Sequence, residues 1–203
     1  MINLLYYIRI LLKFNIIIRI YLFEIYMSNN EGQTNQTYQN NQDKINKVNR
    51  DPQVKDPHIG VGIFVADVTN NKILIGKRLQ GGNLAQPGGW LERYETWEEC
   101  GKRELMEETN IDITSERLIH ISTYNCLDIE NYGHNVAVQL YCEINEKEIE
   151  LIKNVEPDKC EGWFWVDLPF VYENIDKLFL PMRMYFQKYK GLKNVSELYC
   201  KQN

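Results

Sequence analysis

The sequence predicts an α/β fold, and three observations lead to this class. Apolar and β-branched runs of strand length are separated by turn residues, one helix carries complete start and stop signals, and a second helical pattern lies near the C-terminus. Once the N-terminal residues 1–56 are set aside, about 145 residues remain, the usual size of one domain with a single core.

The strands are predicted from β-branched and apolar runs. The first two flank Thr69-Asn70-Asn71, a typical turn sequence. Between Asn135 and Glu143, apolar and polar residues alternate as they do in a sheet strand. Strands are expected at residues 59–68, 72–79, 116–124, 134–144 and 161–167.

The first helix is predicted at residues 97–109. Thr96, followed three residues later by Glu99, forms the sequence signature of a capping box. Asn110 tolerates the left-handed conformation that ends many helices.

This helix carries three glutamates that share one side. At 100° per residue, Glu104, Glu107 and Glu108 fall within an arc of about 100°. The helical row that begins with Trp97 and Gly101 continues through two of these acids, which predicts that they face inward. Buried carboxylates repel one another unless a cation lies among them.

The ligand chemistry favours Mg²⁺ or Mn²⁺, because hard divalent ions prefer oxygen ligands and are completed by water and phosphate. Zinc is not expected, since the cysteines and histidines show no ligand spacing and are interpreted as buried thiols and ordinary histidines. The odd, scattered cysteines favour a reducing, cytoplasmic location. The residues concerned are Cys100, Cys126, Cys142, Cys160, Cys200, His58, His120 and His134.

A second helix is predicted at about residues 175–189. Its Leu178, Met182, Tyr185 and Phe186 have helical spacing, and we interpret them as core, with a pocket wall as the alternative. Trp163 and Trp165 lie on one face of a strand and are interpreted as core, with a base-stacking platform as the alternative.

The spacing around the first helix resembles a known motif. Gly89, then Glu95 after five residues, then Arg103-Glu104-Leu105-Met106-Glu107-Glu108 after seven more, followed by Thr109-Asn110-Ile111, is similar to the Nudix box of the MutT-related hydrolases. The resemblance implies a Nudix-type α/β/α sandwich with a mixed β-sheet. Asn110 and Tyr94 stand where many members of that family have glycine.

The resemblance also implies roles for these residues. It assigns metal binding to Glu104, Glu107, Glu108 and the Gly89 carbonyl. It assigns catalysis to Glu104, Glu107 and Arg103, with one of the two glutamates taking a proton from water. Glu95 would hold Arg103, because a guanidinium fork can tie a carboxylate to the helix.

Outside the motif, residues 59–189 are similar to the branch of MutT homologues that hydrolyses oxidised and thiopurine nucleoside triphosphates. The similar segments include Lys72–Arg78, Pro87-Gly88-Gly89 and Asn154-Val155-Glu156-Pro157. The substrate-binding residues implied by this branch are Arg78, Gln86, Gly88, Gly89 and Met182.

The function expected from this resemblance is a metal-dependent nucleoside triphosphate diphosphatase that releases a monophosphate and pyrophosphate and sanitises the nucleotide pool. The alternatives are a Nudix hydrolase of a dinucleoside polyphosphate, a nucleotide sugar or an RNA cap, and a non-catalytic nucleotide-binding module. A nucleotide is the expected partner; the net charge of −5 and the absence of a basic stripe predict no duplex nucleic acid. A homodimer is left open.

The N-terminal region is expected to lie outside the catalytic domain, which we place at residues 57–203. Residues 1–27 are apolar and basic, but charged residues interrupt them, so no uncharged run reaches the roughly 18 residues that span a bilayer. A mitochondrial presequence, a membrane-surface segment and a functionless extension preceding a start at Met27 remain open. Residues 28–56, rich in Asn and Gln, are predicted to be a disordered linker.

Overall fold

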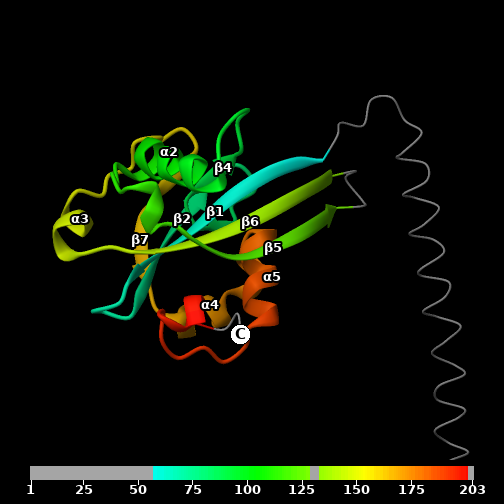
Figure 1. The fold of residues 1–203 in the computed structure, drawn as a ribbon. Coiled ribbons are helices and arrows are strands. Elements are labelled where there is room, and N and C mark those ends of the chain that lie inside the picture. The colour runs from blue at the N-terminus through cyan, green and yellow to red at the C-terminus, as the bar shows by residue number, and fades with distance from the viewer. Residues whose placement is uncertain (1–56, 129–132, 201–203) are drawn as a thin grey trace, which may run out of the picture. The chain divides into compact units, whose positions relative to one another are not determined.

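The computed structural model describes residues 57–128 and 133–200. The predictions for residues 1–56 lie outside these ranges. Within the described ranges, no helix is long and apolar enough to cross a membrane. Their elements, shown in Figure 1, are β1 (His58–Asp67), β2 (Lys72–Arg78), β3 (Leu84–Ala85), β4 (Gly88–Trp90), α2 (Trp97–Thr109), η1 (Ser115–Arg117), β5 (Ile119–Asp128), β6 (Gly133–Glu143), α3 (Glu146–Glu150), β7 (Cys160–Val166), α4 (Leu168–Glu173), η2 (Ile175–Lys177), α5 (Leu180–Lys188) and α6 (Glu197–Cys200).

The strands form one seven-stranded mixed sheet. Its main path runs β3-β2-β1-β6-β5, while β4 pairs with β1 and β7 pairs with β2. Strands β1 and β6 are parallel, and the other pairs are antiparallel. The five predicted strands are present with ends shifted by a few residues. The largest shift is at β5, whose expected start is taken by the 3₁₀ turn η1.

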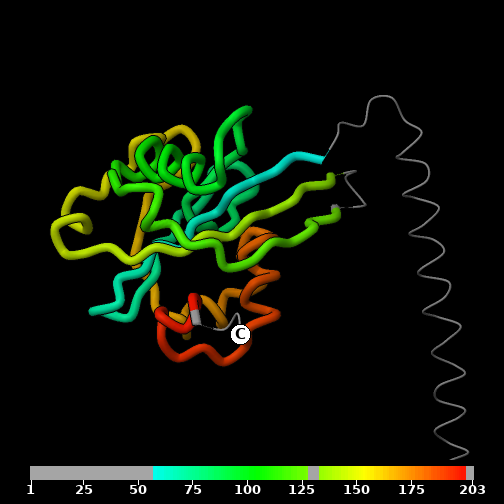
Figure 2. Tube along the Cα trace, in the orientation of Figure 1, coloured from blue at the N-terminus to red at the C-terminus, as the bar shows by residue number. Residues whose placement is uncertain are grey.

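Strand β1 explains why both faces of the sheet need a cover. Successive side chains of a strand point to opposite faces, and from Ile63 to Ala66 every residue is buried. Ile63 and Val65 pack on the side of α2, whereas Phe64 and Ala66 pack on the side of α4 and α5. Figure 1 shows these helices on opposite faces, and the trace in Figure 2 shows the same layers. The predicted α/β/α sandwich is therefore confirmed.

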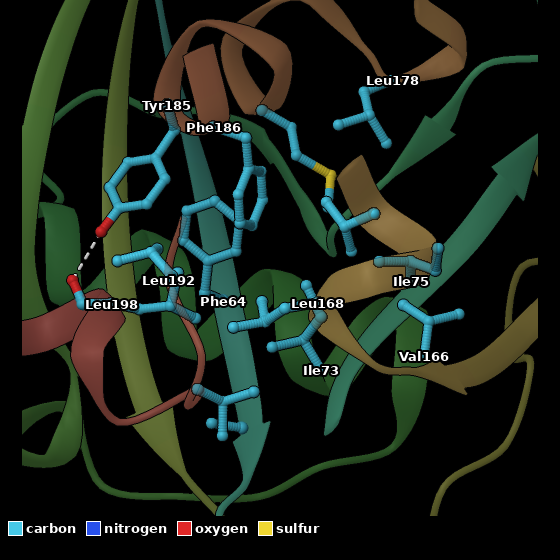
Figure 3. Close-up of a cluster of buried hydrophobic side chains, with 14 of the residues drawn as sticks. Phe64, Ile73, Ile75, Val166, Leu168, Leu178, Tyr185, Phe186, Leu192 and Leu198 are labelled. Atoms are coloured by element: carbon cyan, nitrogen blue, oxygen red, sulfur yellow. Dashed lines mark hydrogen bonds between the residues drawn. The ribbon is translucent and has the colours of Figure 1, made fainter. Parts of the chain in front are cut away.

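The α5 side of the core is aromatic. Phe64 packs against Tyr185 with ring centroids 4.9 Å apart and against the edge of Phe186 at 5.6 Å. The Tyr185 hydroxyl donates a 2.6 Å hydrogen bond to the Leu198 carbonyl, so its buried polar atom is satisfied (Figure 3). This bond fixes the C-terminal helix α6 to α5.

Helix α2 begins and ends where the sequence predicts. The Thr96 hydroxyl accepts a 3.2 Å hydrogen bond from the Glu99 N–H, and the Glu99 carboxylate accepts one of 2.7 Å from the Thr96 N–H. Asn110 has φ 62° and caps the other end in the left-handed conformation. Local signals alone therefore determine the ends of this helix.

The second predicted helix, at 175–189, is wrong in its first part. Ile175–Lys177 forms a 3₁₀ turn, Leu178 is extended, and α5 begins only at Leu180. Pro181 explains the late start, because proline fits the first turn of a helix, whereas inside a longer helix it would lack the N–H that bonds to the preceding turn. The core interpretation is confirmed, since Leu178 and Met182 are fully buried.

The two tryptophans of β7 are also core residues. Trp163 and Trp165 are partly buried and pack on the cluster beneath α2. Their apolar rings close this layer at the β7 edge, as the core interpretation predicts.

The α2 cap gives a test of the fold. Thr96→Ala removes the hydroxyl that accepts the Glu99 N–H, and we expect it to lower the free energy of unfolding by about 1 kcal/mol. Denaturant titration of the full chain measures this. Thr69→Ala, at an exposed turn position, is the control and should change stability little. Equal stabilities of the two variants would contradict the assigned cap.

Candidate active site

Helix α2 presents its three acids at different depths. Glu104 is buried with 9% of its surface exposed, and Glu108 is half-buried. The Glu107 side chain is 51% exposed and lies at the rim. The predicted inward row fails at Trp97, which is 39% exposed in the first turn and packs against His120 with ring centroids 5.1 Å apart.

Two glycines of β4 bring the backbone of the sheet against these acids. The Gly88 N–H donates a 2.9 Å hydrogen bond to Glu108 Oε2. At Gly89, any side chain would overlap the Glu104 carboxylate. Gly88 adopts φ 152°, and a Cβ there would meet the Val61 carbonyl of β1. Both positions therefore require glycine for the close contact between β4 and α2.

Arg103 joins the acids to the loop before the helix. Its Nε and Nη2 donate to the two oxygens of Glu95 at 2.7 and 3.1 Å, which gives the predicted bidentate pair. Its Nη1 bonds to Glu104 at 2.7 Å and to Glu107 at 3.1 Å, and Nη2 bonds to the Trp90 carbonyl at 3.0 Å. Hydrogen bonding to Arg103 lowers the pKa of Glu95, so this carboxylate stays ionised.

Burial has the opposite effect on the inner acids. Desolvation raises the pKa of Glu108 to about 7, although the Gly88 N–H bond opposes the rise. Desolvation also raises the pKa of Glu104, and hydrogen bonding to Arg103 offsets part of that rise. Neighbouring negative charges add to these rises. Glu104 raises the pKa of Glu108, and Glu107 raises the pKa of Glu104. Such a set of desolvated oxygens is stabilised by a cation.

The residues at this site fit a hard divalent ion. The donors are carboxylates and backbone, and the missing side chain at Gly89 lets the backbone lie directly against the Glu104 carboxylate. Within residues 57–128 and 133–200, no three His, Cys, Asp or Glu side chains already converge as a ligand set. Glu104 and Glu107 are instead both hydrogen-bonded to Arg103.

Tyr94, in the loop between β4 and α2, has an unusual backbone. It adopts φ 73°, and its side chain is fully exposed. This conformation suits glycine, which explains why glycine is common here in the resembling motif. Asn110 occupies the other such position at low cost, because asparagine tolerates it.

The comparison with protein families decides the identity of this site. The family described as NUDIX domain matches residues 56–185, which span the sheet, α2 and most of α5. The chain belongs to the Nudix family. It is therefore a pyrophosphohydrolase, and its α2 is the helix of the Nudix motif.

Solved structures share this fold. A MutT NUDIX hydrolase from Burkholderia pseudomallei is 24% identical with a TM-score of 0.54, over 67% of this chain and 100% of that one. A MutT protein from Methanosarcina mazei Go1 is 18% identical with a TM-score of 0.54, over 68% and 96%. A bifunctional NMN adenylyltransferase/ADP ribose pyrophosphatase from Francisella tularensis is 21% identical with a TM-score of 0.54, over 76% and 47%.

The C-terminal end of the Nudix helix is held by a segment that the sequence did not link to it. The Glu108 carbonyl accepts a 3.2 Å hydrogen bond from the Val155 N–H and a 3.0 Å bond from the Trp163 indole. The Thr109 carbonyl accepts a 3.0 Å bond from the Lys153 N–H. These donors satisfy carbonyls that a helix end otherwise leaves unpaired.

The same segment adds charged groups to the site. Lys159 pairs with Glu156 at 2.6 Å. Its positive charge offsets part of the rise in the pKa of both Glu104 and Glu108. Glu156 raises the pKa of Glu108. The resemblance included Glu156 without linking it to the acids, and it did not include Lys159, because only the fold brings these two residues to the helix from the loop before β7.

The predicted substrate-binding residues divide between the two sides of the sheet. Gly88 and Gly89 contact the acids, as described above. Gln86 is buried near the α5 side, and Met182 lies fully within the core there. The Arg78 guanidinium stacks on Phe179, 4.6 Å from the ring centroid. The contacts of all the predicted substrate-binding residues with substrate stay predictions. A surface depression of about 460 Å³ near Lys72 and Trp165 includes none of them.

The interpretation of the thiols as buried groups is confirmed for four of the five. Burial raises the pKa of Cys100 and Cys142 to about 12, which keeps them protonated. The side chain of Cys200 lies outside the described part. The free, buried cysteines are Cys100, Cys126, Cys142 and Cys160.

Burial of Glu108 predicts a pH dependence of stability. Its pKa is about 7 in the fold against the usual 4.5, so between these values the folded chain holds a proton that the unfolded chain has released. Without added metal, the free energy of unfolding should fall by about 2 kcal/mol as the pH rises from 4.5 to 7. Denaturant titration across this range measures the fall.

The variant Glu108→Gln should flatten this pH dependence, and Mg²⁺ should flatten it in the native chain, since a cation favours the ionised form. Glu150→Gln, on the exposed end of α3, is the control and should keep the slope. An unchanged slope in Glu108→Gln would refute the assignment.

Proposed function

We propose that this Nudix enzyme is a metal-dependent nucleoside triphosphate diphosphatase that releases a monophosphate and pyrophosphate. The observation that carries the proposal is the burial of Glu104 and Glu108 against the Gly88–Gly89 backbone. Desolvated carboxylates beside bare backbone form a site for a divalent cation and the phosphates that complete its coordination.

Glu104, Glu107, Glu108 and the Gly89 carbonyl would hold Mg²⁺ or Mn²⁺. When bound, the ion supplies positive charge for the diphosphate and makes water more acidic. Arg103 would keep Glu104 oriented, because Glu95 and the Trp90 carbonyl already fix its guanidinium.

In the reaction, a water oxygen adds to a phosphorus of the α–β linkage and the bond to the bridging oxygen breaks. The water proton passes to a carboxylate, which we assign to Glu104 or Glu107. Glu107 is exposed at the rim and can reach solvent, whereas Glu104 touches the Gly89 backbone. Both are linked to Arg103, so one guanidinium orients either base.

Three features support nucleoside triphosphates as the substrates. The segments around Arg78, Pro87 and Asn154 are similar to the MutT-homologue branch that hydrolyses oxidised and thiopurine nucleotides. Two of the fold neighbours are MutT proteins. Gln86 lies two residues before Gly88, so the segment that carries the diphosphate site also carries a buried amide on the α5 side of the sheet. Phosphates at the glycines and a base at Gln86 would make one continuous nucleotide site.

A second candidate is hydrolysis of another nucleoside diphosphate derivative, such as a nucleotide sugar, a dinucleoside polyphosphate or an RNA cap. The neighbour from Francisella tularensis, described as an ADP ribose pyrophosphatase complexed with AMP and a Mn ion, favours this alternative. The acids act only on the diphosphate that all these molecules share.

A substrate panel separates the two candidates. The full chain with Mg²⁺ is incubated with (d)NTPs, oxidised and thiopurine triphosphates, ADP-ribose, diadenosine polyphosphates and capped RNA. We expect pyrophosphate release from triphosphates, with a kcat/KM at least about tenfold above the other compounds. Preferential cleavage of ADP-ribose, or release of phosphate in place of pyrophosphate, would reject the proposal.

Variants at the diphosphate site test the assigned roles. Glu104→Gln and Glu108→Gln should each lower kcat by about 100-fold or more, because each removes a charged ligand. Gly89→Ala should have a similar effect, since its methyl group displaces the Glu104 carboxylate. Glu98→Gln, on the same helix outside the acid set, is the matched control. Full activity in Glu104→Gln and Glu108→Gln would show that the metal assignment is wrong.

A further inference from the structure

Two glutamine amides are buried together near the α5 side of the sheet. Gln86 is 8% exposed and Gln139 is 1% exposed. The Gln86 Nε2 donates a 2.5 Å hydrogen bond to the Gln139 Oε1. Buried amides are unfavourable unless they are paired, so this contact must have a structural or functional reason.

The pairing leaves one polar atom over. The Gln86 Oε1 is buried and has no hydrogen-bond partner among the described residues. A single amide–amide bond uses the donor end of Gln86 and leaves its carbonyl free to accept. A free, buried acceptor that is held in place is suited to bind an N–H group of a ligand.

The backbone beneath the pair is shaped to admit it. Gly62 of β1 lies opposite Gln139 of β6 in the sheet register. A Cβ at Gly62 would lie 2.6 Å from Gln86 Nε2 and 3.3 Å from Gln139 Oε1. Both amides therefore rest on a strip of β1 without a side chain. In β5, the buried Ser122 lies opposite Gln139 and adds a hydroxyl group to this area.

The pair is also tied to the diphosphate site. Gln86 is followed by Pro87, whose carbonyl accepts a 2.9 Å hydrogen bond from the Ile63 N–H of β1. Gly88, the next residue, donates to Glu108. The segment that carries the Gln86 amide is thus fixed to the acid helix within two residues. Gln139 belongs to a different strand, and nothing in its local sequence indicates such a role.

We infer that Gln139 is a positioning residue that turns the Gln86 carbonyl toward the base of the substrate, so that the enzyme selects bases presenting an N–H donor. Gln139 accepts from the Gln86 amide and thereby decides which end of that amide is free. The selected class comprises nucleotides with an exocyclic amino group at this point. This inference rests on the proposed nucleotide substrate, and it adds a requirement on the base.

The test compares substrates that differ in one amino group. GTP is paired with ITP, and ATP with purine riboside triphosphate, and kcat and KM are measured for each with the full chain and Mg²⁺. In at least one pair, the amino-bearing member should have a kcat/KM about tenfold or more above its partner. Equal values in both pairs would overturn the inference.

The variant Gln139→Leu removes the acceptor for Gln86. The preference within the pair should fall to less than about twofold, mainly through a higher KM for the preferred member, with kcat little changed. Gln139→Glu retains a carboxylate oxygen that accepts from Gln86, and it should keep the preference. Gln187→Leu, at an exposed position of α5, is the matched control. An unchanged preference in Gln139→Leu would refute the positioning role.

Two further measurements keep the outcomes separate. If Gln139→Leu does not fold, as judged by its thermal transition, Gln139→Met, which matches glutamine in length, replaces it. If the native chain cleaves ADP-ribose and no triphosphate, the proposed function fails, and the base preference is then measured with ADP-ribose and its hypoxanthine analogue. Loss of the preference in the variant with either substrate class supports the inference, and its retention rejects it.

Discussion

The close contact between strand β4 and helix α2 is the constraint on which this site depends. Gly88 and Gly89 have no side chains, so the backbone of the sheet reaches two carboxylates that would otherwise stay in water. Burial makes the acids costly to ionise, and this cost is what gives them affinity for a cation. Arg103 and Glu95 then hold the outer part of the set, since their bidentate pair links the helix to the loop before it.

The parts of this structure that could be predicted from sequence are those with local causes. Thr96, Glu99 and Asn110 determine the ends of α2 through hydrogen bonds within a few residues. The long strands follow from runs of apolar residues, because a strand covered on both faces has no polar side. Strand β4 has three residues and no alternation to recognise, and it forms because β1 lies beside it.

The site was predictable to the same extent. The motif predicted the Arg103–Glu95 pair and the proximity of Gly89 to the acids, because these residues lie within α2 and the short segment before it, while their roles in metal binding stay predictions. The inward position predicted for Trp97 is wrong, because helical periodicity does not show whether the first turn of a helix still packs on the sheet. Residues that arrive from other strands have no signal in the motif. The buried pairing of Gln86 became visible only with the sheet register, which brings a distant strand to its amide.

The hydrogen bonds at the C-terminal end of α2 have a consequence for motion. Donors from Val155 and the Trp163 indole hold the Glu108 carbonyl, so this end of the helix cannot fray independently of β7. The opposite end follows the loop containing Tyr94, whose backbone is strained and whose ring contacts solvent. The end of α2 that carries the inner acid Glu108 is therefore joined to a distant part of the chain, whereas the Thr96 end is held only by contacts within a few residues.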